Sequence, residues 1–353
     1  MKIGVLTAPL GDRDRRAAFE TVSGFGYEAV ELGSGEFTTD LHAGLDDLVA
    51  DPAAVATLRQ DLDDFGLELS ALSCHGNPLH PNPDYAARAD QVTRDSIRAA
   101  AELGVDAVNL FSGCPGTPEG GDYPNWVVHP WPQYFGDLLE WQWTERVIPY
   151  WTDLNAFAAE HGVGLAIEMH PSNVVYNTDT LLRLREASGD GIGANFDPSH
   201  LWWQGMDPIV SMRAISAADA LFNIHIKDVA LNRTEIERTG VLSNPVDGNP
   251  APWAFTTVGR GHGSQFWCTF ADELSALGYE GVLSVEHEDE LAPVEEALAR
   301  SIEFLRECVW RESPSDAVWL EGHDPPYPRP TAPWSNGSEG PDPGNNPTPG
   351  GNK

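Results

Sequence analysis

Short apolar runs alternate with longer amphipathic stretches from residue 2 to about residue 310. The short runs are rich in Val, Ile, Leu and Phe, which is typical of strands buried on both faces of a parallel sheet. They predict eight strands, at Lys2–Thr7, Ala29–Leu32, Glu68–Ser73, Ala107–Phe111, Gly164–Glu168, Ile192–Phe196, Leu221–Ile226 and Val282–Val285. The stretches between them have the apolar spacing of helices that pack on one face. They predict helices at Arg13–Phe25, Pro52–Phe65, Tyr85–Leu103, Tyr150–His161, Thr180–Ala187, Trp267–Leu277 and Pro293–Val309.

Glycines mark the points where several predicted helices hand over to the next strand. Such a glycine commonly takes the left-handed conformation that ends a helix; the candidates are Gly26, Gly66, Gly104, Gly162 and Gly278. Eight repeated strand–helix units predict a parallel sheet, and at this length a closed (β/α)8 barrel is the natural arrangement. An open doubly wound sheet would need a glycine-rich phosphate loop after the first strand, and residues 7–11 (TAPLG) do not form one.

Two regions depart from this repeat. The segment Ser112–Pro149 is rich in Gly, Pro and Trp, including Trp126 and Trp131. It predicts a long loop after the fourth strand, where barrel loops cover or shape active sites. From about residue 311 the chain is rich in Pro, Gly, Asn and Ser, which predicts little burial of apolar surface. We therefore expect a barrel domain at residues 1–310 and a C-terminal extension at residues 311–353 that is disordered toward its end.

Composition excludes several classes of ligand and location. The formal net charge of −33 disfavours nucleic acid and anionic membranes as partners. No run approaches 18 apolar residues, and the N-terminus is expected to be a strand, not a signal peptide, so a cytoplasmic location is predicted. The scattered cysteines do not suggest a disulfide framework or a structural zinc site; they are Cys74, Cys114, Cys268 and Cys308.

Strand parity identifies candidate metal ligands. Alternate residues of a barrel strand point inward, and the last inward residue reaches the active site at the C-terminal end. In the last four predicted strands this position carries a metal-competent side chain, namely Glu168, Asp197, His225 and Glu286. Three carboxylates and one imidazole suit Mn²⁺, Mg²⁺ or Co²⁺ better than structural Zn²⁺. One divalent ion is predicted there, with Mn²⁺ expected first and Mg²⁺ or Co²⁺ as alternatives.

Other polar residues fall near the same rim. His75, His170 and His200 are candidates for proton transfer, with His170 also a candidate substrate contact. Lys227 is the one lysine away from the two termini, and parity turns it inward beside His225. We also expect Lys227, Asn109 of the fourth strand and Trp126 of the following loop to contact substrate.

The motifs EMHPSN (168–173), NFDPSH (195–200), NIHIKD (223–228), VGRGHG (258–263) and LSVEHED (283–289) together resemble the xylose isomerase-like superfamily of sugar isomerases and epimerases. The resemblance spans residues 2 to about 310. It implies metal ligation by Glu168, Asp197, His225 and Glu286, and a substrate contact by His200. It also implies that Glu168 and Glu286 act as a paired acid and base on opposite faces of a sugar. A cation bound to adjacent sugar oxygens acidifies the C–H bond between them, and such a group then removes the proton to give an enediolate.

The segments FSGCPG, NWVVHPWP and LEWQWTERVIPYW resemble a subgroup that includes the large subunits of bacterial C-glycoside deglycosidases. This implies cleavage of 3-oxo-glycosides by proton abstraction and elimination, with the Trp-rich loop over an aromatic aglycone. It also implies a separate small β-sandwich partner subunit, and an oligomer is expected.

Three other functions are known to use barrels of this kind or would fit one. A ketose 3-epimerase, sugar isomerase or inosose-type dehydratase would use the same metal and proton chemistry without the partner. An endonuclease IV-like enzyme would need a histidine on the fourth strand, where Asn109 and Phe111 stand, and a basic surface. A non-catalytic sugar-binding barrel remains, although all four candidate ligands are present. No basic cluster in the sequence marks a phosphate site.

Overall fold

The computed structural model describes residues 1–243 and 250–310, and within them eight parallel strands close into a barrel. Neighbouring strands follow the order β1-β10-β7-β6-β5-β4-β3-β2. Their bounds are β1 Lys2–Leu6, β2 Ala29–Glu36, β3 Glu68–His75, β4 Ala107–Phe111, β5 Gly164–Glu168, β6 Ile192–Phe196, β7 Leu221–Ile226 and β10 Val282–Val285. All eight predicted strands and the (β/α)8 fold class are confirmed. The predicted division at residue 310 and the disorder of residues 311–353 fall outside the described residues.

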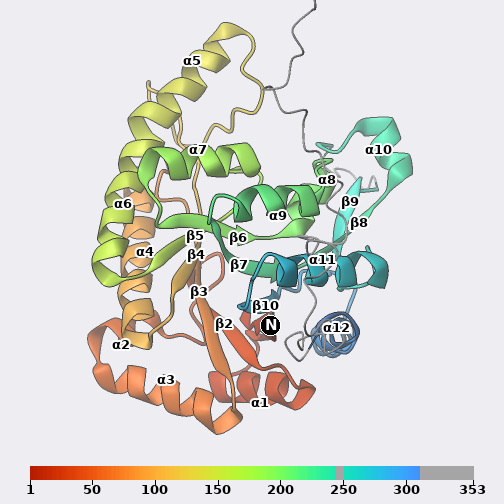
Figure 1. Ribbon diagram of the computed structural model, residues 1–353. Coiled ribbons are helices and arrows are strands. Elements are labelled where there is room, and N and C mark those ends of the chain that lie inside the picture. Colours follow the sequence, from red (N-terminus) through yellow and green to blue (C-terminus); the bar gives the residue numbers. More distant parts are fainter. Residues whose placement is uncertain (244–249, 311–353) are drawn as a thin grey trace, which may run out of the picture.

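Helices surround the barrel on its outside (Figure 1). The seven that the sequence predicts are present, as α1 Arg15–Phe25, α3 Pro52–Phe65, α4 Pro83–Leu103, α6 Ile148–His161, α7 Thr178–Ser188, α11 Ser264–Ala276 and α12 Val294–Cys308. The five predicted glycines all have positive φ, from 65° at Gly66 to 90° at Gly26. The helix-ending role expected of them is therefore confirmed. Short elements that the sequence did not predict are η1 Ala8–Leu10, α2 Leu45–Ala50, α8 Pro198–Trp203, α9 Pro208–Ser216 and α10 Arg233–Thr239.

The region after β4 is less of a loop than expected. Only its first part is irregular, because α5 (Gln133–Trp141) and the π-helical turn η2 (Gln142–Val147) run on into α6. Trp143 and Val147 are buried in the core, and Arg183 stacks over the Trp143 ring at 4.2 Å. Tertiary packing thus outweighs the modest helix propensity of a Trp-rich segment. The prediction of a loop through Pro149 was wrong for this second part.

A two-stranded antiparallel ribbon follows β7 and was also not predicted. It pairs β8 (Asp228–Leu231) with β9 (Trp253–Thr256). In Figure 1 this ribbon and α10 lie on the far side of the molecule from α5. The ribbon stands at the carboxyl end of β7, so it belongs to the rim on which barrel active sites form.

The core is apolar and continuous between the barrel and its helices. Cys268 of α11 and Cys308 of α12 form a disulfide, whereas Cys74 and Cys114 are free and buried. A separation of 40 residues could not reveal this bridge; it depends on two neighbouring helices packing together. Among the described residues, no helix is long and apolar enough to cross a bilayer.

Candidate metal centre

The four predicted metal ligands meet inside the barrel at the carboxyl ends of its last strands. Glu168 ends β5, His225 lies in β7, and Asp197 and Glu286 directly follow β6 and β10. One potential ligand atom from each lies within 4.8 Å of the others, and all four residues are buried. Oxygen ligands of Mg²⁺ lie about 2.1 Å from the ion, so donors on opposite sides of it are about 4 Å apart. The four groups could therefore hold one divalent ion.

The local backbone orients the carboxylate of Asp197. This residue caps the N-terminus of α8, and its Oδ1 accepts a hydrogen bond from the Ser199 amide at 2.8 Å. Its Oδ2 makes no hydrogen bond within the described chain, although the Lys227 Nζ lies 3.1 Å away. The Nε2 atoms of His75 and His200 are likewise buried without a hydrogen bond among the described residues. Buried polar atoms are normally satisfied, so these atoms fit a site made for a further group.

Positive charge from the protein balances the carboxylates. Lys227 is 2% exposed, and its Nζ lies 2.8 Å from Glu286 Oε2 and 3.4 Å from Glu288 Oε2. Its ammonium also lies 4.6 Å from the centre of the Phe255 ring. Burial by itself lowers the pKa of Lys227, but Asp197 and the two glutamates outweigh this and raise it well above its usual value. Lys227 is therefore a fixed cation beside the candidate ligands.

The two candidate glutamate ligands have opposite electrostatic environments. Burial and the charge of Glu286 raise the pKa of Glu168 well above its usual value. Burial acts in the same direction on Glu286, but Lys227 and His225 outweigh it and hold the pKa of Glu286 well below its usual value. Such a divergence is what separates a proton donor from a proton acceptor.

The three predicted histidines lie around Glu168. His200 Nε2 is 3.2 Å from Glu168 Oε1, and His75 Nε2 is 3.4 Å from Glu168 Oε2. The His170 and His200 ring centres are 4.3 Å apart, and these two residues with Glu168 form a second group whose atoms could share an ion. Burial lowers the pKa of His75 to about 3 and that of His170 to about 4, and it holds that of His200 well below its usual value. All three rings are therefore neutral near pH 7.

Glu31 of β2 is a site residue that the sequence reasoning missed. It is completely buried, and its Oε1 lies 2.9 Å from His225 Nε2. Ser73 and Ser284 donate to the same carboxylate. Burial raises the pKa of Glu31, but His225 and these hydroxyls outweigh it and lower the pKa to about 2. Parity could have found it, because Glu31 alternates with the apolar Val30 and Leu32.

Glu31 also changes the interpretation of Asn109. The Asn109 Nδ2 donates to Glu31 Oε1 at 2.8 Å, so the amide orients this carboxylate. Its Oδ1 accepts no hydrogen bond from the described chain, and a substrate contact there stays a prediction. Trp126 packs edge-on against Tyr176 at 5.4 Å, and its predicted substrate contact also stays a prediction.

The VGRGHG segment is held by Asp228. This buried carboxylate accepts hydrogen bonds from the amides of Gly259, Gly261 and His262, and it lies 2.8 Å from His262 Nδ1. The His262 ring stacks on Trp202 at 3.8 Å. Asp228 thus fixes the loop that follows the β8–β9 ribbon.

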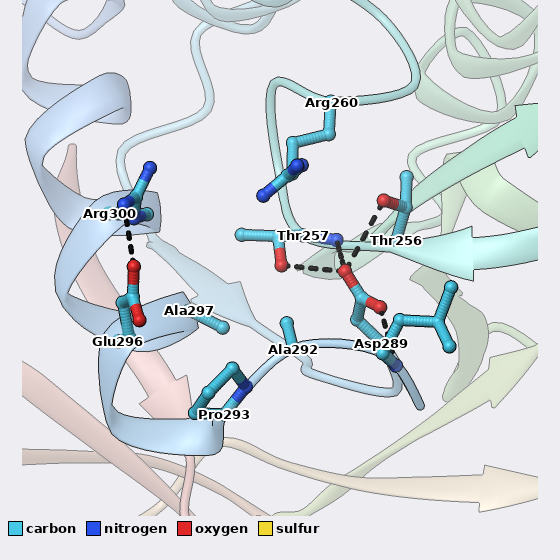
Figure 2. Close-up of a pocket in the computed structure, with 10 residues that line it drawn as sticks. Thr256, Thr257, Arg260, Asp289, Ala292, Pro293, Glu296, Ala297 and Arg300 are labelled. Atoms are coloured by element: carbon cyan, nitrogen blue, oxygen red, sulfur yellow. Dashed lines mark hydrogen bonds and ion pairs between the residues drawn. The ribbon is translucent and has the colours of Figure 1, made fainter.

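One cavity near the rim brings two arginines together, which the sequence did not reveal. Figure 2 shows Arg260 and Arg300 facing a space of about 220 Å³ beside the start of α12. Arg300 pairs with Glu296 at 2.5 Å, and Asp289 accepts hydrogen bonds from Thr256 and Thr257 in the same wall. Two acidic side chains therefore share this cavity with the two arginines.

Comparison with known proteins agrees with this geometry. The family model described as "Xylose isomerase-like TIM barrel" matches residues 19–308. The chain belongs to this family. Within it, the uncharacterized protein YfiH of Bacillus subtilis (strain 168) is 34% identical over 314 residues, which cover 88% of this chain and 99% of YfiH. The rhizopine catabolism protein MocC of Rhizobium meliloti is 28% identical over 283 residues, covering 79% of this chain and 76% of MocC.

Among solved structures, the 3-keto-D-glucoside 4-epimerase YcjR from E. coli shares the fold, with a TM-score of 0.59 and 14% identity over 87% of this chain and all of that one. The predicted superfamily is therefore confirmed. The likeness to C-glycoside deglycosidases stays a prediction.

Proposed function

We propose that this xylose isomerase-like barrel is a divalent-metal-dependent enzyme that removes a proton next to a sugar carbonyl. The observation that carries the proposal is the convergence of Glu168, Asp197, His225 and Glu286 on one buried point. The family to which the chain belongs supports it, as does the likeness in fold to YcjR, a 3-keto-D-glucoside 4-epimerase. We favour Mn²⁺ as the ion because three carboxylates and one imidazole form a hard-to-borderline donor set. When bound, the ion would polarise the sugar oxygens and acidify the C–H bond between them.

The side chains around this point are suited to move the proton. Burial and the charge of Glu286 raise the pKa of Glu168, whereas Lys227 and His225 lower the pKa of Glu286, so Glu168 binds a proton more readily than Glu286 does. They can therefore act as an acid and a base at one substrate carbon. His75 and His200 touch Glu168 while neutral, so either can relay its proton. Lys227 adds a fixed positive charge where negative charge develops on the sugar oxygens.

The reaction that we favour is cleavage of a 3-oxo-glycoside. A base takes the proton from C2, and the electrons of that C–H bond enter the enolate that forms with the C3 carbonyl. The enolate then expels the aglycone from C1, leaving a double bond between C1 and C2, and the aglycone takes up a proton. A small β-sandwich partner subunit and an oligomeric assembly belong to this proposal. A cytoplasmic location remains the expectation.

A ketose 3-epimerase, isomerase or inosose-type dehydratase is the second candidate. It needs the same proton abstraction, and YcjR, which shares the fold, is an epimerase. In this case the proton returns to the sugar, or water leaves, and no partner subunit is needed.

Hydrogen exchange with solvent tests both candidates. The Mn²⁺-loaded protein is incubated in D₂O with methyl 3-oxo-β-glucoside and, separately, with free ketoses. Deuterium beside the carbonyl, observed by NMR, reports proton abstraction, and the substrate that exchanges identifies the reaction class. Release of methanol distinguishes elimination from epimerisation. Absence of exchange in every substrate, also with a candidate β-sandwich partner present, would contradict the proposal and favour a non-catalytic sugar-binding barrel.

A further inference from the structure

A second cavity, of about 670 Å³, lies on the same rim as the metal centre. Its walls come from residues 241–243 and 251–255 around the β8–β9 ribbon, from residues 171–172 after β5 and from residues 288–291 after β10, with Trp203 of α8. The volume lies within the range of roughly 300–1,000 Å³ that small-molecule sites occupy. We call it the ribbon pocket.

The ribbon pocket shares wall residues with the surroundings of the metal centre. Phe255, which lines it, has its ring 4.6 Å from Lys227 Nζ and 5.3 Å from the His200 ring. Glu288, which also lines it, lies 3.4 Å from the same ammonium. One molecule could therefore place a sugar over the metal centre and a substituent in the ribbon pocket.

Three aromatic rings, those of Trp203, Trp253 and Phe255, form part of the wall of the pocket. Trp253 stacks on Trp203 with ring centres 4.7 Å apart and planes 11° apart, and it packs against Phe255 at 5.4 Å. The Trp253 Nε1 donates to the Val241 carbonyl at 3.0 Å, which fixes the orientation of its ring. By contrast, the Nε1 of Trp203 is buried and has no acceptor among the described residues, although Trp203 is only 3% exposed. The Nε1 atom is enclosed by the protein, so Trp203 contributes its ring and not this donor to the wall of the pocket.

The rim and the charge of the pocket narrow the class of occupant. Leu242 and Leu291 line it and are 71% and 97% exposed, so apolar surface is left facing the solvent. Among the described residues that line it, the ionisable ones are all acidic, namely Glu288, Asp289 and Glu290. A negatively charged substituent would be repelled there, whereas an uncharged apolar one would cover exposed apolar surface.

We propose that the ribbon pocket receives the aglycone of a glycoside, and that this aglycone is aromatic and uncharged. This inference rests on the proposed function for the position of the sugar. It also places the aglycone against the β8–β9 ribbon and not against Trp143 or Trp131 of the segment after β4. In that segment Trp143 lies in the core, and Trp131 is 72% exposed just before α5. In Figure 1, α5 lies at the left of the view and the ribbon at the right.

Equilibrium binding to the full chain tests the inference without any catalytic step. Isothermal titration compares p-nitrophenyl, p-carboxyphenyl and methyl β-glucosides, with and without Mn²⁺. We expect the p-nitrophenyl compound to bind about tenfold tighter than the methyl compound, and the p-carboxyphenyl compound to lose most of that gain. Trp253→Ala should remove the preference for the aryl group, and Trp253→Phe should restore most of it because a phenyl ring still stacks.

Trp131→Ala is the matched control, since it removes an exposed tryptophan outside the pocket and should leave the preference unchanged. A melting temperature and a Mn²⁺ affinity like those of the wild type show that each variant is folded. Equal binding of aryl and methyl glucosides, or loss of the preference in Trp131→Ala instead of Trp253→Ala, overturns the inference. If no sugar exchanges deuterium but the Trp253-dependent preference persists, the proposed function fails while the aromatic site stands. If methyl 3-oxo-β-glucoside exchanges but no aryl preference exists, the proposed function stands and the aromatic site is refuted.

Discussion

The two halves of the barrel contribute different chemistry to the same point. The half formed by β5, β6, β7 and β10 supplies all four candidate ligands and Lys227. The half formed by β1–β4 supplies groups that touch these residues, chiefly Glu31 against His225 and His75 against Glu168. One half therefore offers donors to an ion, while the other fixes the orientation and protonation of those donors. Groups that hydrogen-bond to metal ligands commonly orient those ligands and tune the affinity of the site for its metal.

The largest expected effect comes from the ligand half. Glu286→Gln keeps the shape of the side chain but removes a charged ligand and the proposed base. Deuterium exchange should fall by about 10²–10⁴-fold, measured by NMR with the Mn²⁺-loaded protein. Glu280→Gln, at an exposed acid just before β10, is the control and should retain exchange. Full activity in Glu286→Gln would show that this carboxylate is not part of the reaction.

The next effect concerns the cation that balances the ligands. Lys227→Met leaves three buried carboxylates with less positive charge, so the metal-free variant should lose about 3 kcal/mol in its free energy of unfolding. Adding Mn²⁺ should recover part of this loss because the ion supplies charge at the same place. Urea denaturation with EDTA and with Mn²⁺ measures both quantities. Lys2→Met, at an exposed ion pair, should change stability little; an equal loss with and without Mn²⁺ would refute the charge argument.

Glu31→Gln tests whether the first half really acts on the metal. The carboxylate orients the His225 ring through Nε2 and leaves Nδ1 for the ion, so its loss should weaken Mn²⁺ binding by about 10–100-fold. Calorimetric titration with Mn²⁺ gives this value. Glu68→Gln, an exposed residue at the start of β3, is the matched control. Unchanged affinity in Glu31→Gln would mean that the two halves are not coupled through His225.

The smallest effect is the pH dependence of metal binding. Burial lowers the pKa of His225, but Glu31 and Glu286 outweigh it and raise that pKa well above its usual value, so the ring carries a proton at neutral pH without metal. A metal ligand must give up that proton, so Mn²⁺ affinity should rise with pH, by up to about tenfold per unit for each proton released. Titrations from pH 6 to 8 in buffers of different ionisation enthalpy count the protons. Glu31→Gln should flatten the slope, because His225 then binds its proton less tightly; a slope of zero in the wild type would contradict the argument.

Parity was the most informative signal in the sequence, and its limits are physical. It predicted the inward residues of β5, β6, β7 and β10 because an alternating strand has only two faces. The same rule turns Glu31 inward, but it does not show which residue the carboxylate contacts. That partner, His225, is separated from it by 194 residues.

The sequence alone determined the fold class, the eight strands, the glycines that end the helices and the four candidate ligands. These follow from periodicity and from local backbone conformation, which neighbouring residues specify. Tertiary structure decided the Glu31–His225 contact, the burial of Trp143, the disulfide between α11 and α12, and the aromatic ribbon pocket. Each of these depends on segments far apart in the chain packing together, and the net free energy of such packing is not encoded in any local pattern.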